Sequence, residues 1–128
     1  FRIHPGMDHE QVGQFLDKGF EQAGIDGFQR TLHFYMPGGE IPQDDRFVKL
    51  CLEERERQFG IKSDPQPFDA SCEQCFLARE GIQTVICGPG DIAQAHTVGE
   101  FTWEKQVRDA VSLYERIIDR VLYKTNYI

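Results

Sequence analysis

Residues 81–101 read GIQTVICGPGDIAQAHTVGEF, and this segment decides how the rest of the chain is interpreted. Its first part, residues 82–87, is a nearly continuous run of apolar and β-branched side chains, typical of a strand buried on both faces of a parallel sheet. Gly88, Pro89 and Gly90 then interrupt any helix or strand, and His96 follows in a polar loop. Because ligands in open α/β sheets bind beyond the carboxyl ends of the strands, the segment predicts a site around His96.

The segment resembles the C-terminal signature of peptidase family M20, whose members are metal-dependent amidohydrolases and peptidases. In that family a G-I-P-T-V-x-x-G-P-G run leads to an A-H-T/S-x-x-E-F/Y run, and the chain follows this order in one continuous stretch. The chain looks most similar to acetylornithine deacetylases and succinyl-diaminopimelate desuccinylases. The resemblance implies that His96 binds one zinc ion of a two-zinc centre, in which cobalt can replace zinc. Glu100 is close enough in sequence to orient the loop, either by supporting this ligand from outside the coordination sphere or in a purely structural role.

The resemblance further implies positions that contact substrate. In the family the Gly-Pro-Gly turn lies beside the substrate, which assigns Gly88 and Gly90 to substrate binding; the residues alone indicate only a tight bend that ends a strand. Asp69 stands at the end of a segment that is glycine-rich and touches substrate in many relatives, although the glycines are absent here. A helix N-cap is the alternative role for Asp69. No catalytic residue of the family has a matching position in the chain.

Composition limits the classes of function. The chain has 128 residues, of which 40% are hydrophobic and 27% charged, as expected of a soluble globular protein. Its net charge of −7 disfavours nonspecific binding to nucleic acid or to anionic membranes. The sequence shows no apolar run long enough to span a bilayer, no signal peptide and no cysteine spacing typical of secreted disulfide scaffolds. These features predict a cytoplasmic protein with reduced thiols, and the resemblance implies a small-molecule partner.

The N-terminal part predicts a strand–helix–strand unit. Asp8 is suited to cap a helix that Gly24 ends, with an apolar face formed by Val12, Phe15, Leu16, Gly19, Phe20 and Ala23. Residues 28–36 then alternate as in a strand. The run Arg2-Ile3-His4-Pro5-Gly6 is similar to an R-x-x-P-G junction in the smaller lid or dimerisation domain of the family. The resemblance therefore implies that residues 1–37 end a ferredoxin-like lid domain, that residues 38–128 end a zinc-peptidase-like catalytic domain, and that the protein is a homodimer.

Three further helices are expected in the remaining sequence. One begins after Asp44 or Asp45 and runs to about residue 59, where Gly60 ends it, and its charged residues 53–57 are predicted to face solvent. A short helix covers residues 69–79. The last covers residues 103–123, capped by Thr102, with a predicted buried stripe made of Val107, Val111, Tyr114, Ile118 and Val121. The predicted fold class is α/β.

The predicted function is the C-terminal portion of a metal-dependent hydrolase that cleaves the amide bond of an N-acyl amino acid or small peptide. By itself this portion is expected to be inactive, because the family's general base and its other metal ligands have no counterpart here. One alternative is a non-catalytic dimerisation or interaction module in which the Gly-Pro-Gly loop is structural. Another is a thiol-redox protein that uses Cys72 and Cys75, which are spaced as a C-x-x-C pair.

Overall fold

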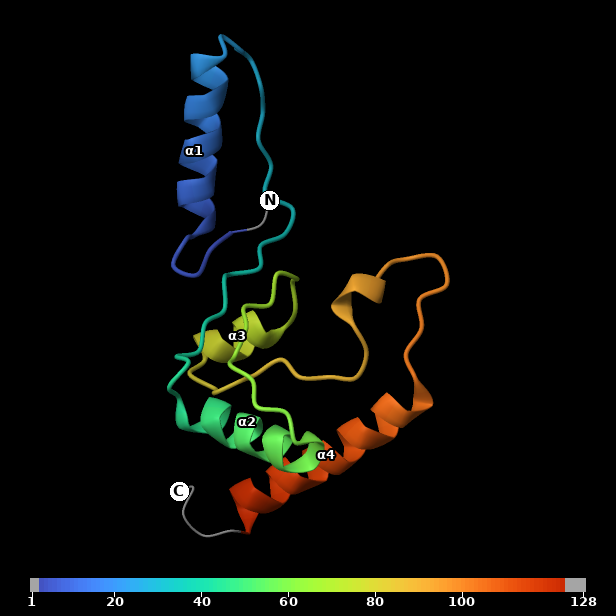
Figure 1. Cartoon of the computed structure of the whole chain (residues 1–128). Coiled ribbons are helices and arrows are strands. Elements are labelled where there is room, and N and C mark those ends of the chain that lie inside the picture. The colour runs from blue at the N-terminus through green and yellow to red at the C-terminus, as the bar shows by residue number, and fades with distance from the viewer. Residues whose placement is uncertain (1–2, 124–128) are drawn as a thin grey trace. The chain divides into compact units, whose positions relative to one another are not determined.

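A computed structural model describes residues 3–123, and its regular elements are all helices (Figure 1). Two compact units divide the chain. The first unit comprises Phe1–Ile41 and Asp69–Thr84, and the second comprises Pro42–Phe68 and Val85–Ile128. In chain order the elements are α1 (His9–Gln22), α2 (Arg46–Phe59), α3 (Gln74–Arg79), the 3-10 helix η1 (Ile92–Gln94) and α4 (Glu104–Leu122).

The predicted α/β fold class is wrong, since none of residues 3–123 forms a strand. Residues 28–36 and 82–87 were the expected strands, and both run as irregular chain. A strand is stabilised by hydrogen bonds to a neighbouring strand, so β-branched composition alone cannot form one. Within the described part of the chain, the backbone of residues 28–36 pairs with no other backbone segment. The predicted start of the first strand, at Phe1 and Arg2, lies outside the described residues.

Helix α1 of the first unit begins and ends as the sequence predicts. The Asp8 carboxylate accepts a hydrogen bond from the Gln11 backbone N–H at 2.8 Å, and the Gln11 side chain accepts one from the Asp8 N–H at 3.1 Å. This reciprocal pair satisfies two backbone donors at the helix start. Gly24 has a φ of +67°, the left-handed conformation that commonly follows a helix end. Local sequence therefore determines both ends of α1.

The apolar face of α1 remains largely uncovered by the rest of its unit. Phe15 is 74% exposed. Phe20 contacts Phe28 with ring centroids 4.4 Å apart, and Arg30 holds Asp17 through two hydrogen bonds of 3.0 and 3.1 Å. The Arg30 guanidinium lies against Gly13, where an added Cβ would stand 2.2 Å away from it. The segment that follows α1 thus folds back onto one side of the helix and leaves the other open.

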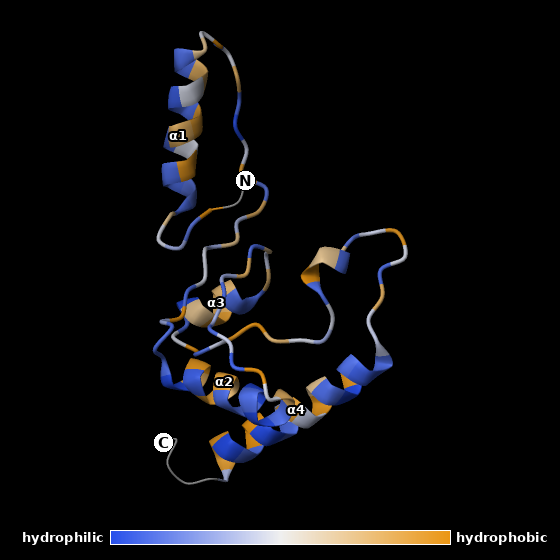
Figure 2. Cartoon of the chain, viewed as in Figure 1, coloured by the Kyte–Doolittle hydropathy of each residue, from blue (hydrophilic) through white to orange (hydrophobic). Residues whose placement is uncertain are grey.

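In the second unit, α2 has the predicted ends. Asp45 is the cap, since its carboxylate accepts a 2.7 Å hydrogen bond from the Phe47 N–H. Gly60 closes the helix with a φ of +68° and a hydrogen bond from its N–H to the Glu56 carbonyl. Val48 and Leu50 of α2 are buried, and they form part of the small core of this unit. Blue and orange residues interleave along α2 and α4 in Figure 2, as expected of amphipathic helices.

Helix α4 packs against α2, but through a different face from the one predicted (Figure 1). Leu113 is 4% exposed, whereas Val111 and Ile118 of the predicted stripe are 53% and 52% exposed. The predicted stripe lies on a different face from Leu113, because residues two positions apart on a helix do not share a face. Thr102 is also not the cap; Trp103 takes that position, and the Gln106 side chain accepts from its N–H at 3.2 Å. The helix length itself is close to the prediction.

The prediction that residues 53–57 form a solvated face is wrong at one position. Glu54 is the most deeply buried side chain among the described residues, with 2% of the residue exposed. Its carboxylate forms ion pairs with Arg57 at 2.7 Å, Arg116 at 2.9 Å and Arg120 at 2.9 Å. Arg116 and Arg120 belong to α4, so Glu54 connects the two helices.

Nowhere in residues 3–123 is there a helix both long and apolar enough to cross a bilayer.

Candidate functional site

The loop that leads from Cys87 to α4 is held together by short-range hydrogen bonds. Asp91 caps η1 by accepting a 2.9 Å hydrogen bond from the Ala93 N–H. The Thr97 hydroxyl donates to the Gln94 carbonyl at 2.7 Å, and the Thr97 N–H donates to the same oxygen at 3.2 Å. Because each donor and acceptor are separated by two or three residues, the sequence of the loop itself specifies its shape.

His96 has an unusual backbone conformation in this loop. Its φ of +63° is the sole positive φ of a non-glycine residue among residues 3–123. A left-handed conformation costs a residue with a Cβ roughly 1–2 kcal/mol, and such residues occur preferentially at functional sites. The His96 N–H donates a 3.0 Å hydrogen bond to Glu100 Oε2, which offsets part of this cost. Glu100 therefore contacts the backbone N–H of His96, and its role in support of a metal ligand remains a prediction.

The imidazole of His96 is available to a ligand. His96 is exposed, and within the described part of the chain neither of its ring nitrogens has a hydrogen-bond partner. A neutral imidazole can offer a nitrogen to zinc, and its other nitrogen then requires a partner of its own. The side chain is chemically suited to the predicted role, which remains a prediction.

The two glycines of the turn differ in why they are needed. Gly90 has a φ of +94°, and a Cβ there would stand 3.3 Å from the Thr102 hydroxyl, so a larger residue would be both strained and crowded. A Cβ on Gly88 would make only ordinary contact with the Tyr114 hydroxyl, at 3.9 Å. That hydroxyl donates to the Cys87 carbonyl at 2.7 Å and fastens the start of the loop to α4. Gly90 thus has a structural reason to be glycine, while substrate contact by Gly88 and Gly90 remains a prediction.

Asp69 belongs to the first unit and His96 to the second. Asp69 is exposed, and it does not cap a helix, because α3 begins later, at Gln74, with Glu73 in the cap position. The expectation of a helix over residues 69–79 is therefore correct only for its second half. Contact between Asp69 and substrate remains a prediction.

The described residues do not offer a complete metal centre. No group of three or more His, Cys, Asp or Glu side chains within residues 3–123 is arranged to hold a metal ion. The carboxylate nearest to His96 along the loop, Glu100, is engaged by the His96 N–H. A tetrahedral zinc site takes three or four protein ligands. His96 has a side chain of the kind that such a site uses, and metal binding by His96 remains a prediction.

The cysteines favour a structural role. Cys51, Cys72, Cys75 and Cys87 are all free thiols. Cys75 is buried, and its thiol donates to the Cys72 carbonyl at 3.2 Å, one helical turn away. Desolvation raises the pKa of Cys51 to about 12, and the nearby Cys87 adds to this effect. A thiol that stays protonated is a weak nucleophile, so Cys51 is not suited to redox chemistry.

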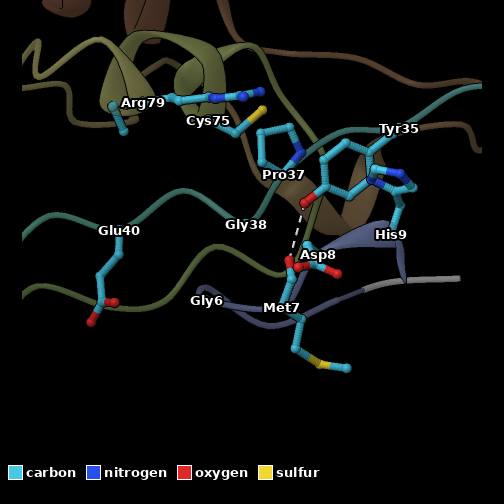
Figure 3. Close-up of a pocket in the computed structure, with 11 residues that line it drawn as sticks. Gly6, Met7, Asp8, His9, Tyr35, Pro37, Gly38, Glu40, Cys75 and Arg79 are labelled. Carbon is cyan, nitrogen blue, oxygen red and sulfur yellow. Dashed lines mark hydrogen bonds between the residues drawn. The ribbon is translucent and has the colours of Figure 1, made fainter. Parts of the chain in front are cut away.

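A cavity in the first unit was not predicted from the sequence (Figure 3). It has a volume of about 520 Å³ and is lined by the turn before α1, by residues 35–40 and by α3. Among its lining groups, the Tyr35 hydroxyl donates to the Met7 carbonyl at 3.0 Å and the His9 ring packs edge-on against Tyr35 with ring centroids 5.3 Å apart. The sequence signal that could have indicated this packing is the two Pro-Gly pairs at residues 5–6 and 37–38. The two segments lie against each other, since an added Cβ on Gly38 would stand 2.5 Å from the Pro5 nitrogen.

Comparison with known proteins adds one finding. The model of a protein family, described as peptidase family M20/M25/M40, matches residues 7–120. No curated protein and no solved structure matches the chain. The matched region includes α1, α2, α3, η1, most of α4 and the whole of the His96 loop. Since this is far more than half of the sequence, the chain belongs to peptidase family M20/M25/M40, a family of hydrolases.

Proposed function

We propose that the chain is part of a metal-dependent hydrolase that cleaves the amide bond of an N-acyl amino acid or of a small peptide, as a deacetylase or desuccinylase does. Membership of peptidase family M20/M25/M40 supports the hydrolase class. The finer assignment to deacylases rests on the resemblance of residues 81–101 to the signature of those enzymes. The substrate is a small molecule, and the assembly is a homodimer.

The observation that carries this proposal is the backbone conformation of His96 together with the exposure of its side chain. A histidine in a left-handed conformation, fixed through its N–H by Glu100, extends an unpartnered imidazole from an ordered loop. Loops held by rigid elements commonly carry binding and catalytic residues. Residues held in such costly conformations cluster at functional sites, which supports a functional role for His96.

In this proposal His96 is one ligand of a zinc site, at which cobalt can replace zinc. The other ligands and the general base are supplied from outside residues 3–123 in this proposal, because the resemblance to the family provides no matching position for them in the chain. It follows that residues 3–123 alone neither bind zinc tightly nor hydrolyse substrate. Gly88 and Gly90 would border the substrate, and their lack of side chains would let it approach the backbone closely.

A non-catalytic interaction module is the second candidate. The observation that favours it is the exposed predicted stripe of α4, where Val107, Val111 and Ile118 are 43%, 53% and 52% exposed. Apolar side chains that gather on one helix face commonly mark a protein interface. The two candidates differ in what they require of His96, since only the enzyme needs its imidazole.

The test is an amide-hydrolysis assay on the protein isolated from its own cells, with a panel of N-acetyl and N-succinyl amino acids. We expect hydrolysis of at least one of them, inhibition by a chelator, and recovery with zinc or cobalt. His96→Ala should lower kcat/KM by on the order of 100-fold or more, since even partners outside a coordination sphere are worth 10–100-fold. His33→Ala, which removes another exposed histidine, is the matched control and should retain activity. Full activity in His96→Ala would overturn the assignment of His96, and a lack of hydrolysis across the panel would favour the interaction module.

A further inference from the structure

We propose that Glu100 is a positioning residue, whose carboxylate holds His96 in the left-handed conformation and so directs the imidazole away from the loop. The inference rests on the proposed function in one respect only: the direction of the imidazole matters because His96 is proposed to bind a metal ion. The claim about conformation stands on the geometry of the loop itself.

The first step of the argument is the energy balance at His96. In the left-handed conformation the Cβ of an L-residue approaches the following carbonyl oxygen, which disfavours this region for histidine. Against this, the His96 N–H donates to Glu100 Oε2 at 3.0 Å, and a hydrogen bond to a charged acceptor is stronger than one to a neutral acceptor. No other residue within 3–123 bonds to that N–H, so Glu100 is the group that compensates for the unfavourable φ.

The second step is that Glu100 is itself fixed in place. Its own N–H donates to the Thr97 carbonyl at 3.2 Å, so backbone and side chain of Glu100 close two overlapping turns over residues 96–100. Gly99, with a φ of +83°, provides the reversal of chain direction that brings the carboxylate back over His96. The turn over residues 97–100 therefore places the Glu100 carboxylate next to the His96 N–H.

The third step separates this role from ligation. Because Glu100 Oε2 is occupied by the backbone N–H, the carboxylate supports His96 without competing for its ring nitrogens. A glutamine at position 100 would keep an acceptor oxygen at the same distance along the side chain, although it would lose the charge. An alanine would remove the acceptor altogether. The pair of variants therefore distinguishes loss of the charge alone from loss of the acceptor.

The experiment compares Glu100→Ala, Glu100→Gln and the unaltered protein, with Glu115→Ala as the control. Glu115 is an exposed glutamate on α4 that has no ion-pair partner among residues 3–123. The first readout is the backbone φ of His96 from NMR couplings and chemical shifts, together with hydrogen exchange of its amide, on the complete protein. In Glu100→Ala we expect φ to become negative and the His96 amide to exchange faster by about tenfold or more, the scale of a lost hydrogen bond to a charged acceptor. Glu100→Gln should largely restore both, and Glu115→Ala should change neither.

The second readout is kcat/KM for the substrate found above, which we expect to fall by about 10–100-fold in Glu100→Ala and to recover partly in Glu100→Gln. A positive φ at His96 in Glu100→Ala would overturn the positioning role and leave the proposed function intact. If φ changes while His96→Ala keeps full activity, the conformational claim holds and the assignment of His96 as a metal ligand fails. If φ changes and no substrate of the panel is hydrolysed, the conformational claim holds and the proposed function fails. Equal losses in Glu100→Ala and Glu100→Gln, with φ unchanged in both, would also contradict the proposal.

Discussion

At the residue scale, the side chain with the largest consequence for the fold is Glu54. It is 2% exposed, yet it carries a charge and contacts three arginines from two helices. Burying a carboxylate is costly unless it is paired and hydrogen-bonded, and here both oxygens are engaged: Oε1 accepts from Arg57 and Arg120, and Oε2 accepts from Arg116. The pairing therefore makes the position of α4 on α2 depend on one glutamate.

The first prediction concerns removal of this carboxylate. Glu54→Ala should lower the free energy of unfolding of the second unit by about 2–3 kcal/mol, somewhat below the usual cost for a fully buried pair because the arginines can regain water. Glu53→Ala should lower it by less than about 1 kcal/mol, because the Glu53 side chain is 52% exposed and within residues 3–123 forms an ion pair with Arg120 alone. Urea unfolding followed by the fluorescence of Trp103, the single tryptophan, measures both. Equal losses in the two variants would contradict the central place of Glu54.

The second prediction concerns pH. Burial is the largest influence on the pKa of Glu54 and raises it, but hydrogen bonds from Arg120 and Arg116 and the charges of Arg57 and Arg116 together hold that pKa below its ordinary value of 4.5. Since the pKa is depressed in the folded state, the stabilisation is complete above the unfolded value and is lost as pH falls through the lower, folded value.

The difference in unfolding free energy between the unaltered protein and Glu54→Gln isolates this contribution from other carboxylates. We expect the difference to be constant above a pH of about 5 and to shrink progressively below the ordinary pKa of 4.5. Measurement by urea unfolding at a series of pH values checks it. A difference that grows as the pH falls would show that the pKa of Glu54 is raised in the folded protein.

At the scale of elements, α4 presents two apolar faces with different surroundings. Leu113 points into the contact with α2 and is buried, while Val111 and Ile118 are more than half exposed. Gln58 of α2 adds to the same contact by donating to the Asp109 carbonyl of α4 at 2.7 Å. Periodicity of apolar residues shows that a helix is amphipathic, but it does not show which neighbour covers which face.

The third prediction uses this difference. Leu113→Ala should destabilise the second unit by about 2–4 kcal/mol, because it removes buried methyl groups and leaves a cavity between the helices. Ile118→Ala, on the exposed face of the same helix, should change the unfolding free energy by less than about 0.5 kcal/mol. Urea unfolding followed by circular dichroism measures both. Comparable losses would mean that Ile118 is buried in the folded protein.

At the scale of the whole molecule, residues 3–123 form two units with little buried apolar surface. The buried hydrophobic residues of this part are Val48, Leu50, Cys75 and Leu113. Hydrophobic burial is the main favourable term in folding, so a core this small predicts low stability for the described residues taken alone. Other interactions therefore matter more for the stability of each unit. These are the cap at Asp8 in the first unit, and the cap at Asp45 and the ion-pair cluster around Glu54 in the second.

The sequence predicted correctly those features that depend on neighbouring residues. The caps at Asp8 and Asp45 and the helix ends at Gly24 and Gly60 each involve groups within four positions of one another. The hydrogen bond from the His96 N–H to Glu100, four positions away, is also local, although the role of Glu100 beside a metal ligand remains a prediction. Local chemistry decides such features wherever the segment lies.

The sequence failed where distant segments decide the outcome. Residues 82–87 have a strand-like composition, but a strand needs a partner, and none is provided within residues 3–123. Glu54 looked like one member of a solvated charge run, and only its arginine partners on α4, about sixty positions later, bury it. No group of three or more metal-binding side chains is arranged to hold an ion within residues 3–123, so the metal site is proposed from the loop alone.

The central claim is that His96 is a metal ligand, and the most direct test is the zinc content of the protein isolated from its own cells. We expect up to two zinc ions per subunit in the unaltered protein and an unchanged content in His33→Ala. His96→Ala should bind zinc at one site on the order of 100-fold more weakly and retain less than the unaltered protein after dialysis. Intact mass and circular dichroism of each sample verify that the compared proteins have the same length and are folded. Equal zinc in His96→Ala and the unaltered protein, or no zinc in either, would contradict the claim.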